Sequence, residues 1–438
     1  MGHFTMDKSG FNRYSALVIF CVSMSMSSIA FGEEREESAP NNGEFIPIIY
    51  SGAAITMGAH SKIFGNIQSV AAASLGEAAE LHGSLSAGAA VTLDKGGLVL
   101  GNITAGEAAT IGASSDVIGD LTAVSSVFIG AESVIGGNLK SDGDAKLGAG
   151  AQVVRNVTAG TSVTLGAHAL VGEDRENREY REYCEYGEYG EYGEYVLTGN
   201  VQAFTGPIVL GLNAVVTGEA KAGTIISRGM NAKVYCKEYQ YYNDPEGSTN
   251  EANDPLATKK DELTQKQIEL ADIFVQTYNE LTTTIDTSRE FYPGVYHASE
   301  LTTTAGITLT FLGSGYGEPD EWLINIDTYL SFGAHLTIEL VDVAPGSTIV
   351  FNAGSYTTIG ANSSLIGTIL AGTYITTGEN TTITGIYGDC GGMFATNEAI
   401  TLGAGSTVGS YGCGRKGDGE EEMMFEEEVI TEITDIGD

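Results

Sequence analysis

The sequence predicts an all-β solenoid, a right-handed β-helix with coils of about 18 residues and one long flanking α-helix. The main observation is a repeat, because similar segments begin at Ala87, Ala105, Ala123 and Ser141, each eighteen residues after the last. Composition agrees, since the 438 residues include 59 glycines but only 8 prolines, with 42% hydrophobic residues and no collagen-type Gly-X-Y period. A fixed period of this length is typical of coils that bury their apolar side chains by stacking on one another.

The first segment is predicted to be a targeting signal. Lys8 and Arg13 precede an apolar run that starts at Ala16 and ends near the small residues Ala30 and Gly32. This layout is typical of a secretory signal peptide over residues 1–32, followed by an acidic linker over residues 33–50. We therefore expect a secreted, extracellular protein with no membrane insertion after the signal is removed, because no other run is long enough to span a bilayer.

The N-terminal coils are predicted over residues 51–237. In segments such as Val91-Thr92-Leu93 the two aliphatic residues fall on one side of a strand and the central residue on the other. The aliphatic residues should form the core. Glycines such as Gly101 and Gly119 should stand at the bends between faces.

One rung is interrupted by a segment rich in tyrosine and glutamate, over residues 173–195. Its tyrosines recur every three residues, from Tyr180 to Tyr195, and this period matches neither a helix nor a strand. We interpret the segment as a solvated loop insertion at a corner of the solenoid. Adhesion to another surface is the functional alternative.

A helix is predicted after a polar connector over residues 238–253. Asp254 is suited to the N-cap and Pro255 to the first helical position. Leu263, Leu270 and Leu281 belong to a series of apolar residues at three- and four-residue steps that continues to Ile285. The helix is therefore expected over residues 254–286, with a length that would let it lie along the whole solenoid and shield one face.

Strand patterns return in residues 287–413, now with many threonines. The segment from Ala399 to Gly405 repeats the motif of the first half, as in residues 162–167, so both halves should belong to one solenoid. Residues 414–438 form an acidic tail that reads as a solvated extension.

Charge and cysteine content limit the partners. Lys plus Arg is 21 and Asp plus Glu is 57, which gives a formal net charge of −36 and argues against nucleic acid and anionic membranes. The four cysteines beyond the signal segment are too widely spaced for a paired Cys-x-x-Cys zinc site. Cys390 and Cys413 are about one coil apart and are candidates for a disulfide, with free thiols as the alternative.

The segment from Leu270 to Val408 resembles the microbial ice-binding, or antifreeze, protein family. The resemblance rests on the residues at 275–279, 292–296, 322–326 and 347–351, and then on the segments at 367–371 and 399–402. It implies a β-helix with a long helix alongside and adsorption to ice through one flat face. The tyrosine-rich insertion, the acidic tail and the many regular coils have no counterpart in the family pattern.

No catalytic or cofactor chemistry is apparent in the sequence. The acidic residues and histidines of the repeats do not recur at one fixed rung position, and the Gly-Gly-x-Gly-x-Asp pattern of calcium-binding repeats is missing. We therefore expect no enzyme, no metal site and no cofactor.

The outward face of the repeats is the candidate site. Alternation places small residues beside a column of hydroxyl groups, repeated at the spacing of stacked strands. The predicted ice-binding residues are Thr358, Thr376 and Thr401 as first choice, with Thr56, Thr92, Thr110 and Thr164 as the extension of the column. Phe128, Asp144 and Lys146 occupy positions that would interrupt its flatness.

Two functions remain open at this stage. The leading hypothesis is a secreted ice-binding protein that slows ice growth or recrystallisation, with the ice crystal surface as its partner. The alternative is a structural or adhesive surface protein, in which the tyrosine-rich insertion or the acidic tail contacts cells or matrix.

Overall fold

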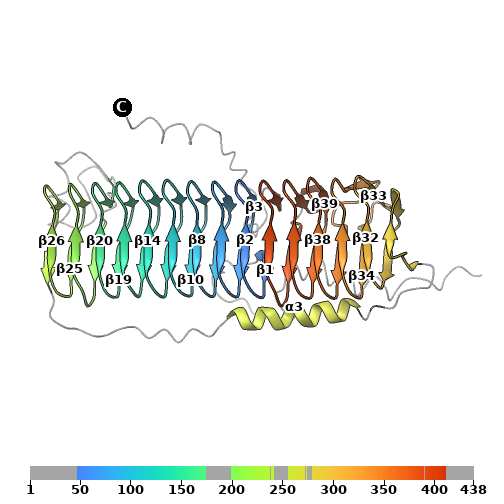
Figure 1. Ribbon diagram of the computed structural model, residues 1–438, viewed down its shortest axis with the longest axis horizontal. Helices are drawn as coiled ribbons and strands as arrows, with labels where there is room; N and C mark the ends of the chain where they lie inside the picture. Colours follow the sequence, from blue (N-terminus) through green and yellow to red (C-terminus); the bar gives the residue numbers. More distant parts are fainter. Residues whose placement is uncertain are drawn as a thin grey trace, which may run out of the picture.

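The computed structural model describes residues 47–173, 199–236, 238–240, 255–271, 273, 279–388 and 390–410. These residues form one elongated rod of stacked coils, with a single helix along part of its length (Figure 1). Each coil contributes one strand to each of three parallel sheets, and each sheet has 15 strands. The predicted solenoid is therefore confirmed.

The three sheets, named A, B and C, run along the rod in the following strand orders. Sheet A contains β28 (Glu238–Gln240), β25 (Ala220–Ala222), β22 (Val201–Ala203), β19 (Val157–Ala159), β16 (Leu139–Ser141), β13 (Leu121–Ala123), β10 (Ile103–Ala105), β7 (Leu85–Ala87), β4 (Asn66–Ser69), β1 (Pro47–Ser51), β43 (Gly392–Ala395), β40 (Thr368–Ala371), β37 (Thr348–Ala353), β34 (Glu321–Ile326) and β31 (Gly294–Ala298). Sheet B contains β26 (Ile226–Arg228), β23 (Ile208–Leu210), β20 (Val163–Leu165), β17 (Ala145–Leu147), β14 (Val127–Ile129), β11 (Ala109–Ile111), β8 (Val91–Leu93), β5 (Ala73–Leu75), β2 (Ile55–Met57), β44 (Ile400–Leu402), β41 (Ile375–Thr377), β38 (Thr357–Ile359), β35 (Leu330–Phe332), β32 (Leu301–Thr303) and β29 (Thr284–Ile285). Sheet C contains β27 (Lys233–Val234), β24 (Val215–Val216), β21 (Leu170–Val171), β18 (Gln152–Val153), β15 (Val134–Ile135), β12 (Asp116–Val117), β9 (Leu98–Val99), β6 (Glu80–His82), β3 (Lys62–Phe64), β45 (Thr407–Val408), β42 (Thr382–Thr384), β39 (Ser364–Ile366), β36 (Thr337–Val341), β33 (Thr308–Leu312) and β30 (Arg289–Phe291).

The order of the coils along the rod differs from their order in the sequence. The first coil, β1 to β3, pairs with the last coil, β43 to β45, in all three sheets. The chain thus starts in the middle of the rod, builds one half outward, and later builds the other half back to the middle, as the blue and red coils of Figure 1 show. We call the contact between the first and last coils the seam.

The seam is closed by the same interactions as any other coil contact. The Gly58 N–H donates to the Leu402 carbonyl at 2.8 Å, and the Lys62 N–H donates to the Ser406 carbonyl at 2.8 Å. Gly58 lies so close to the Ala404 backbone that a Cβ atom there would collide with it. The two halves therefore form one continuous stack.

The register of the N-terminal coils follows the sequence period. Ile103 pairs with Leu121, eighteen residues later, and the paired inward side chains are buried. The tyrosine-rich insertion, residues 173–195, falls between β21 and β22, and residues 174–198 lie outside the described part of the chain. The first strand starts at Pro47, inside the segment predicted as linker, because Ile48 and Ile49 are core residues.

The C-terminal coils are wider and hold the large aromatic side chains. Phe311 stacks on Phe291 with ring centroids 5.0 Å apart, and its edge contacts Trp322 at 5.6 Å. Alanine, valine, leucine and isoleucine fill the N-terminal coils instead. The short 3₁₀ turn η2 (Ile386–Gly388) lies in the longer connection before β43.

The flanking helix α3 (Pro255–Ala271) is shorter than predicted. It begins at Pro255 as expected, but the predicted end at residue 286 is wrong, because Thr284 and Ile285 form strand β29. Leu281 and Ile285 have exposed fractions of 8% and 4% because they lie in the solenoid core. The run of threonines between them favours extended backbone, so the apolar spacing did not indicate helix there.

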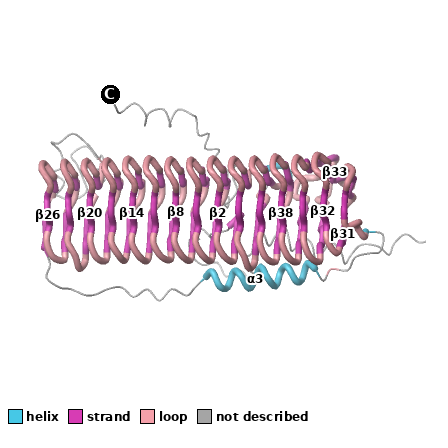
Figure 2. Tube along the Cα trace, viewed as in Figure 1, coloured by secondary structure: helices cyan, strands magenta, loops and turns pink. Residues whose placement is uncertain are grey.

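The helix lies along the C-terminal coils and reaches the seam, where Tyr50 of the first coil belongs to the same buried cluster (Figure 2). Seventeen residues span about 25 Å at the usual helical rise, so α3 cannot shield a whole face of the rod. Leu263 and Leu270 pack against outward side chains of sheet A, namely Leu323, Val350 and Leu370. Beyond the coils next to the seam, no described helix covers sheet A of the N-terminal half.

Candidate functional site

The candidate site is the outward face of sheet B, where each strand presents one central residue to solvent. In β2 the flanking Ile55 and Met57 are buried and the central Thr56 is exposed. The same pattern recurs in β41 around Thr376 and in β44 around Thr401. Short strands with inward flanking residues therefore fix the direction of each hydroxyl group.

All seven predicted threonines stand in one column of sheet B. Thr358 pairs with Thr376, Thr376 with Thr401, and Thr401 with Thr56 across the seam. The column continues through Ser74 to Thr92 and then Thr110. The seam thus makes the first-choice threonines and their extension direct neighbours.

Further hydroxyl side chains extend the same column. Ser74, Ser331, Thr302 and Thr284 also occupy it, although they were not among the predicted site residues. The alternation rule could have found all four, since each lies beside a buried aliphatic residue in its strand. The unbroken series of hydroxyl residues is Thr284, Thr302, Ser331, Thr358, Thr376, Thr401, Thr56, Ser74, Thr92 and Thr110.

The column is interrupted after Thr110. Phe128 is the next residue and has an exposed fraction of 44%, and Lys146 follows with its Nζ 5.8 Å from the centre of the Phe128 ring. Thr164 comes after Lys146 and is therefore separated from the other six predicted threonines.

The residues that stand two positions before each hydroxyl residue in the sequence form a second, companion column on the same face. Its backbone is in register too, because the Ile400 N–H donates to the Ala54 carbonyl at 3.0 Å and the Ile375 N–H donates to the Ala399 carbonyl at 3.2 Å. Near the seam its side chains are alanines, whereas three C-terminal coils carry Tyr329, Tyr356 and Tyr374. The face is thus flat in one part and bulky in another.

The three tyrosines form a stacked ladder. The ring centroids of Tyr356 and Tyr374 are 4.9 Å apart with an interplanar angle of 2°, and those of Tyr329 and Tyr356 are 5.2 Å apart at 7°. This spacing is close to the spacing of the strands themselves. The ring edges therefore stand beside the hydroxyl column as a continuous row.

The coil of β17, which interrupts the column, brings charge to this face. Asp144 lies in the companion column and accepts hydrogen bonds from the Ser162 hydroxyl at 2.6 Å and from the Thr161 hydroxyl. These two hydrogen bonds lower the pKa of the Asp144 carboxyl. Asp144 therefore stays ionised at neutral pH, and the coil that interrupts the column is charged.

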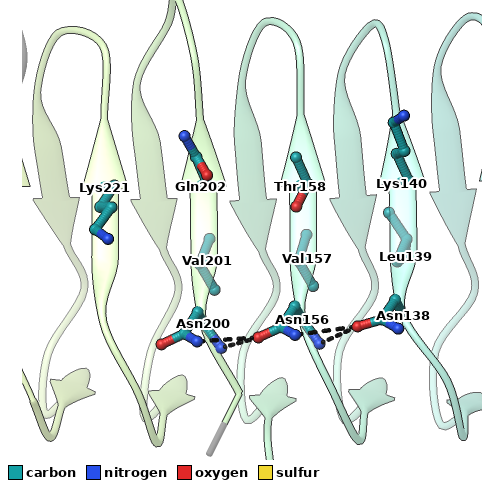
Figure 3. A pocket seen from close by; sticks show the side chains of 10 residues that line it. All are labelled: Asn138, Leu139, Lys140, Asn156, Val157, Thr158, Asn200, Val201, Gln202 and Lys221. Atoms are coloured by element: carbon teal, nitrogen blue, oxygen red, sulfur yellow. Dashed lines mark hydrogen bonds between the residues drawn. The ribbon is translucent and has the colours of Figure 1, made fainter. Parts of the chain in front are cut away.

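A second feature lies on sheet A in N-terminal coils that α3 does not reach. A shallow open groove of about 350 Å³ runs beside Asn138, Asn156 and Asn200 (Figure 3). The Asn156 Nδ2 donates to Asn138 Oδ1 and the Asn200 Nδ2 donates to Asn156 Oδ1, each at 3.1 Å. These side-chain hydrogen bonds link neighbouring coils, and this structural role explains the polar side chains beside the groove.

Within the described ranges, no three His, Cys, Asp or Glu residues are grouped so that they could hold a metal ion. Among the same residues, no helix is long and apolar enough to cross a membrane.

Both cysteines among the described residues are in disulfide bonds. Cys236 and Cys390 are both disulfide-bonded, so the free-thiol alternative is wrong for these two. Cys413 and Cys184 lie outside the described residues, and the pairing of Cys390 with Cys413 stays a prediction. Cys390 belongs to the coil at the seam and does not lie at an end of the rod.

The sequence matches a known family over half of its length. The sequence pattern of the family described as Ice-binding-like matches residues 190–408. Among curated proteins, none matches the sequence significantly.

Solved structures of ice-binding proteins are similar to this chain at low identity. One from the Antarctic ascomycete Antarctomyces psychrotrophicus has 20% identity, covers 49% of this chain and 91% of its own, and has a TM-score of 0.30. A domain of an ice-binding protein from Shewanella frigidimarina has 18% identity, covers 49% and 93% of the two chains, and has a TM-score of 0.30. One from an Antarctic Flavobacteriaceae bacterium has 12% identity, covers 85% and 98%, and has a TM-score of 0.30.

Proposed function

The chain belongs to the ice-binding-like protein family, and on that premise we propose that it is an exported protein that adsorbs to ice through the outward face of sheet B. Adsorption slows the growth and recrystallisation of ice and involves no catalytic step. The ice crystal surface is the partner, and no cofactor is needed.

The observation that carries this proposal is the unbroken hydroxyl column. Eight of its threonines and serines, from Ser331 to Thr110, are consecutive across the seam. Their spacing is set by the hydrogen-bonded strands at about 4.8 Å. A regular array of methyl and hydroxyl groups on a rigid sheet can hold water in a repeating arrangement, which a flexible surface cannot.

The backbone of sheet B supports rigidity of the face. Neighbouring coils exchange backbone hydrogen bonds at every step, as in Gly76 N–H to Met57 carbonyl at 3.1 Å and Val91 N–H to Ala108 carbonyl at 2.9 Å. The inward side chains of the same strands have exposed fractions near zero. The hydroxyl groups are therefore held by a packed core and do not need to be ordered when ice binds.

Thermal hysteresis and ice-recrystallisation assays of the mature chain test the proposal. We expect activity in the parent and a loss of most of it in Thr401→Tyr, because Thr401 is exposed beside the seam and a ring there prevents close contact. Thr104→Tyr is the matched control, since Thr104 is an exposed central residue of β10 in sheet A. An inactive parent, or equal losses in both variants, contradicts the proposal and favours the structural or adhesive surface protein.

Export is proposed from residues 1–32, which lie outside the described part of the chain. The N-terminal sequence of protein recovered from the medium should begin near Glu33. Recovery of the chain only inside cells would contradict export without bearing on ice adsorption.

A further inference from the structure

Along the hydroxyl column the companion residue is alanine in some coils and tyrosine in others, so the face of sheet B has a flat part and a bulky part. In five consecutive coils across the seam the companion residue is alanine. We call these ten residues the Ala/Thr patch: Ala399 with Thr401, Ala54 with Thr56, Ala72 with Ser74, Ala90 with Thr92, and Ala108 with Thr110. The patch is about 19 Å long from Thr401 to Thr110 at the usual strand spacing.

The patch is bounded on one side by the tyrosine ladder. Tyr374 stands in the companion column next to Ala399, since the N–H of Ile375 in the coil of Tyr374 donates to the Ala399 carbonyl. Tyr356 and Tyr329 continue the stack away from the seam. A phenol ring extends much farther from the sheet than a methyl group, so the ladder forms a step beside Ser331, Thr358 and Thr376.

The hydroxyl groups beside the ladder are also engaged with each other. The Thr358 hydroxyl donates to the Ser331 hydroxyl at 3.0 Å, within the column itself. This bond uses the only proton of the Thr358 hydroxyl, which is then not available to donate to an external water molecule.

The patch is bounded on the other side by the coils of β14 and β17. Phe128 follows Thr110 in the column, and Asp144 and Lys146 bring two opposite charges to the next coil. A ring and two charged, hydrated groups cannot lie against the same plane as alanine and threonine.

We propose, on the basis of the ice adsorption argued above, that ice contacts the Ala/Thr patch alone and that the tyrosine ladder excludes it from the threonines farther along the column. Ser74 and Thr56 are central contact residues, and the alanines Ala54 and Ala72 contact ice as well. Thr358 and Thr376 are then outside the contact. The two ends of the folded chain build the binding patch together, because Thr401 comes from the last coil and Thr56 from the first.

Two serines of the same column provide a matched test. Ser74 lies inside the patch and Ser331 beside the ladder, and both are half-buried central residues of short strands in sheet B. Ser74→Tyr should lose most of the thermal hysteresis of the parent, whereas Ser331→Tyr should retain it. Unchanged melting temperatures of both variants show that the fold is intact.

The opposite change tests the role of the ladder. Replacement of Tyr329, Tyr356 and Tyr374 together by alanine extends the flat surface over three more coils and should raise thermal hysteresis above that of the parent. The matching triple replacement by phenylalanine keeps the rings and should leave the activity unchanged. Reduced activity in the alanine variant with an intact fold would mean that the ladder itself contacts ice, and would overturn the proposal.

The thermal hysteresis of the parent and the two serine variants distinguishes failure of the patch from failure of ice adsorption itself. Equal losses in Ser74→Tyr and Ser331→Tyr would overturn the inference but support adsorption along the whole column. An active parent with no loss in either variant would place ice on another face and overturn both. An inactive parent would overturn ice adsorption itself.

Discussion

At the scale of single residues, burial changes the chemistry of Glu321, which stands at the start of β34 beside the first strand residue of β37, Thr348. Burial raises the pKa of the Glu321 carboxyl from 4.5 to about 7. Because the unfolded chain loses this proton near pH 4.5, the folded state binds more protons between pH 4.5 and about 7. The contribution of Glu321 to stability therefore falls as pH rises through this range.

Glu321→Gln should accordingly stabilise the protein at pH 8 and have little effect near pH 4. Glu321 is only partly buried, so solvent screening reduces the effect, and we expect a gain of about 1–2 kcal/mol in the free energy of unfolding at pH 8. Denaturant titrations at both pH values measure the difference. A gain of equal size at pH 4 would show that ionisation of Glu321 is not the cause.

The disulfides are a second feature at this scale. Cys236 precedes β28 at one end of the rod and Cys390 lies in the coil at the seam, ten strand spacings or about 48 Å away along sheet A. Cys413 follows the last described residue, Ser410, by three residues, which span at most about 10 Å. Cys413 therefore cannot reach Cys236, and we expect Cys390 to be its partner.

Peptide mapping without reduction should thus recover Cys390 linked to Cys413, and Cys236 linked to Cys184. Cys184 is the remaining cysteine beyond the signal segment, and it lies in the insertion between β21 and β22. A peptide that joins Cys236 to Cys413, or alkylation of Cys390 without reduction, would contradict this assignment.

At the scale of elements, α3 is attached to sheet A through both apolar and polar contacts. Leu263 and Leu270 are buried against the outward side chains of the C-terminal coils. The Gln267 Nε2 donates to the Ala353 carbonyl at 2.7 Å, and the Asn325 Nδ2 donates to the Leu270 carbonyl at 2.7 Å. The helix therefore stabilises the half of the rod that carries the tyrosine ladder but contacts a different sheet.

Leu263→Ala should lower the free energy of unfolding by about 2–4 kcal/mol, because it leaves a cavity between the helix and sheet A. Ile268→Ala, on the same helix with an exposed fraction of 51%, should change it by less than about 0.5 kcal/mol. The thermal hysteresis of the folded Leu263→Ala protein should equal that of the parent. A loss of activity would indicate that α3 takes part in binding.

At the scale of the whole molecule, the seam joins the two halves into one stack. Ile49 is fully buried and pairs with Met393 of the last coil on one side and with Ile67 on the other. Each coil gains its stability from its neighbours, so loss of one coil contact separates a solenoid into two units. The Ala/Thr patch crosses this contact.

Ile49→Asp should therefore uncouple the halves, because an unpaired charge in this core costs about 3–5 kcal/mol. We expect calorimetry to show one unfolding transition for the parent and two for the variant. Thr104→Asp is the control and should keep one transition, since Thr104 is an exposed central residue of β10 in the same sheet and its charge stays in water. A single transition in Ile49→Asp would show that the halves do not depend on the seam.

The sequence by itself determined the solenoid, the direction of each central threonine and the interruption at Phe128. These features depend on the repeat and on strand alternation, which act between residues close in sequence or one period apart. For this reason the column from Thr56 to Thr110 could be predicted without the structure.

Only the tertiary structure decided that Thr401 stands next to Thr56, that the helix ends at Ala271 and that the three tyrosines stack. The seam joins residues more than three hundred positions apart, and no local pattern distinguishes that contact from a free end of the solenoid. Likewise Leu281 and Ile285 match the spacing of a helix, but burial in the solenoid core stabilises them as part of a coil. Contacts of this kind depend on which distant segments meet, and this is settled by packing of the whole chain.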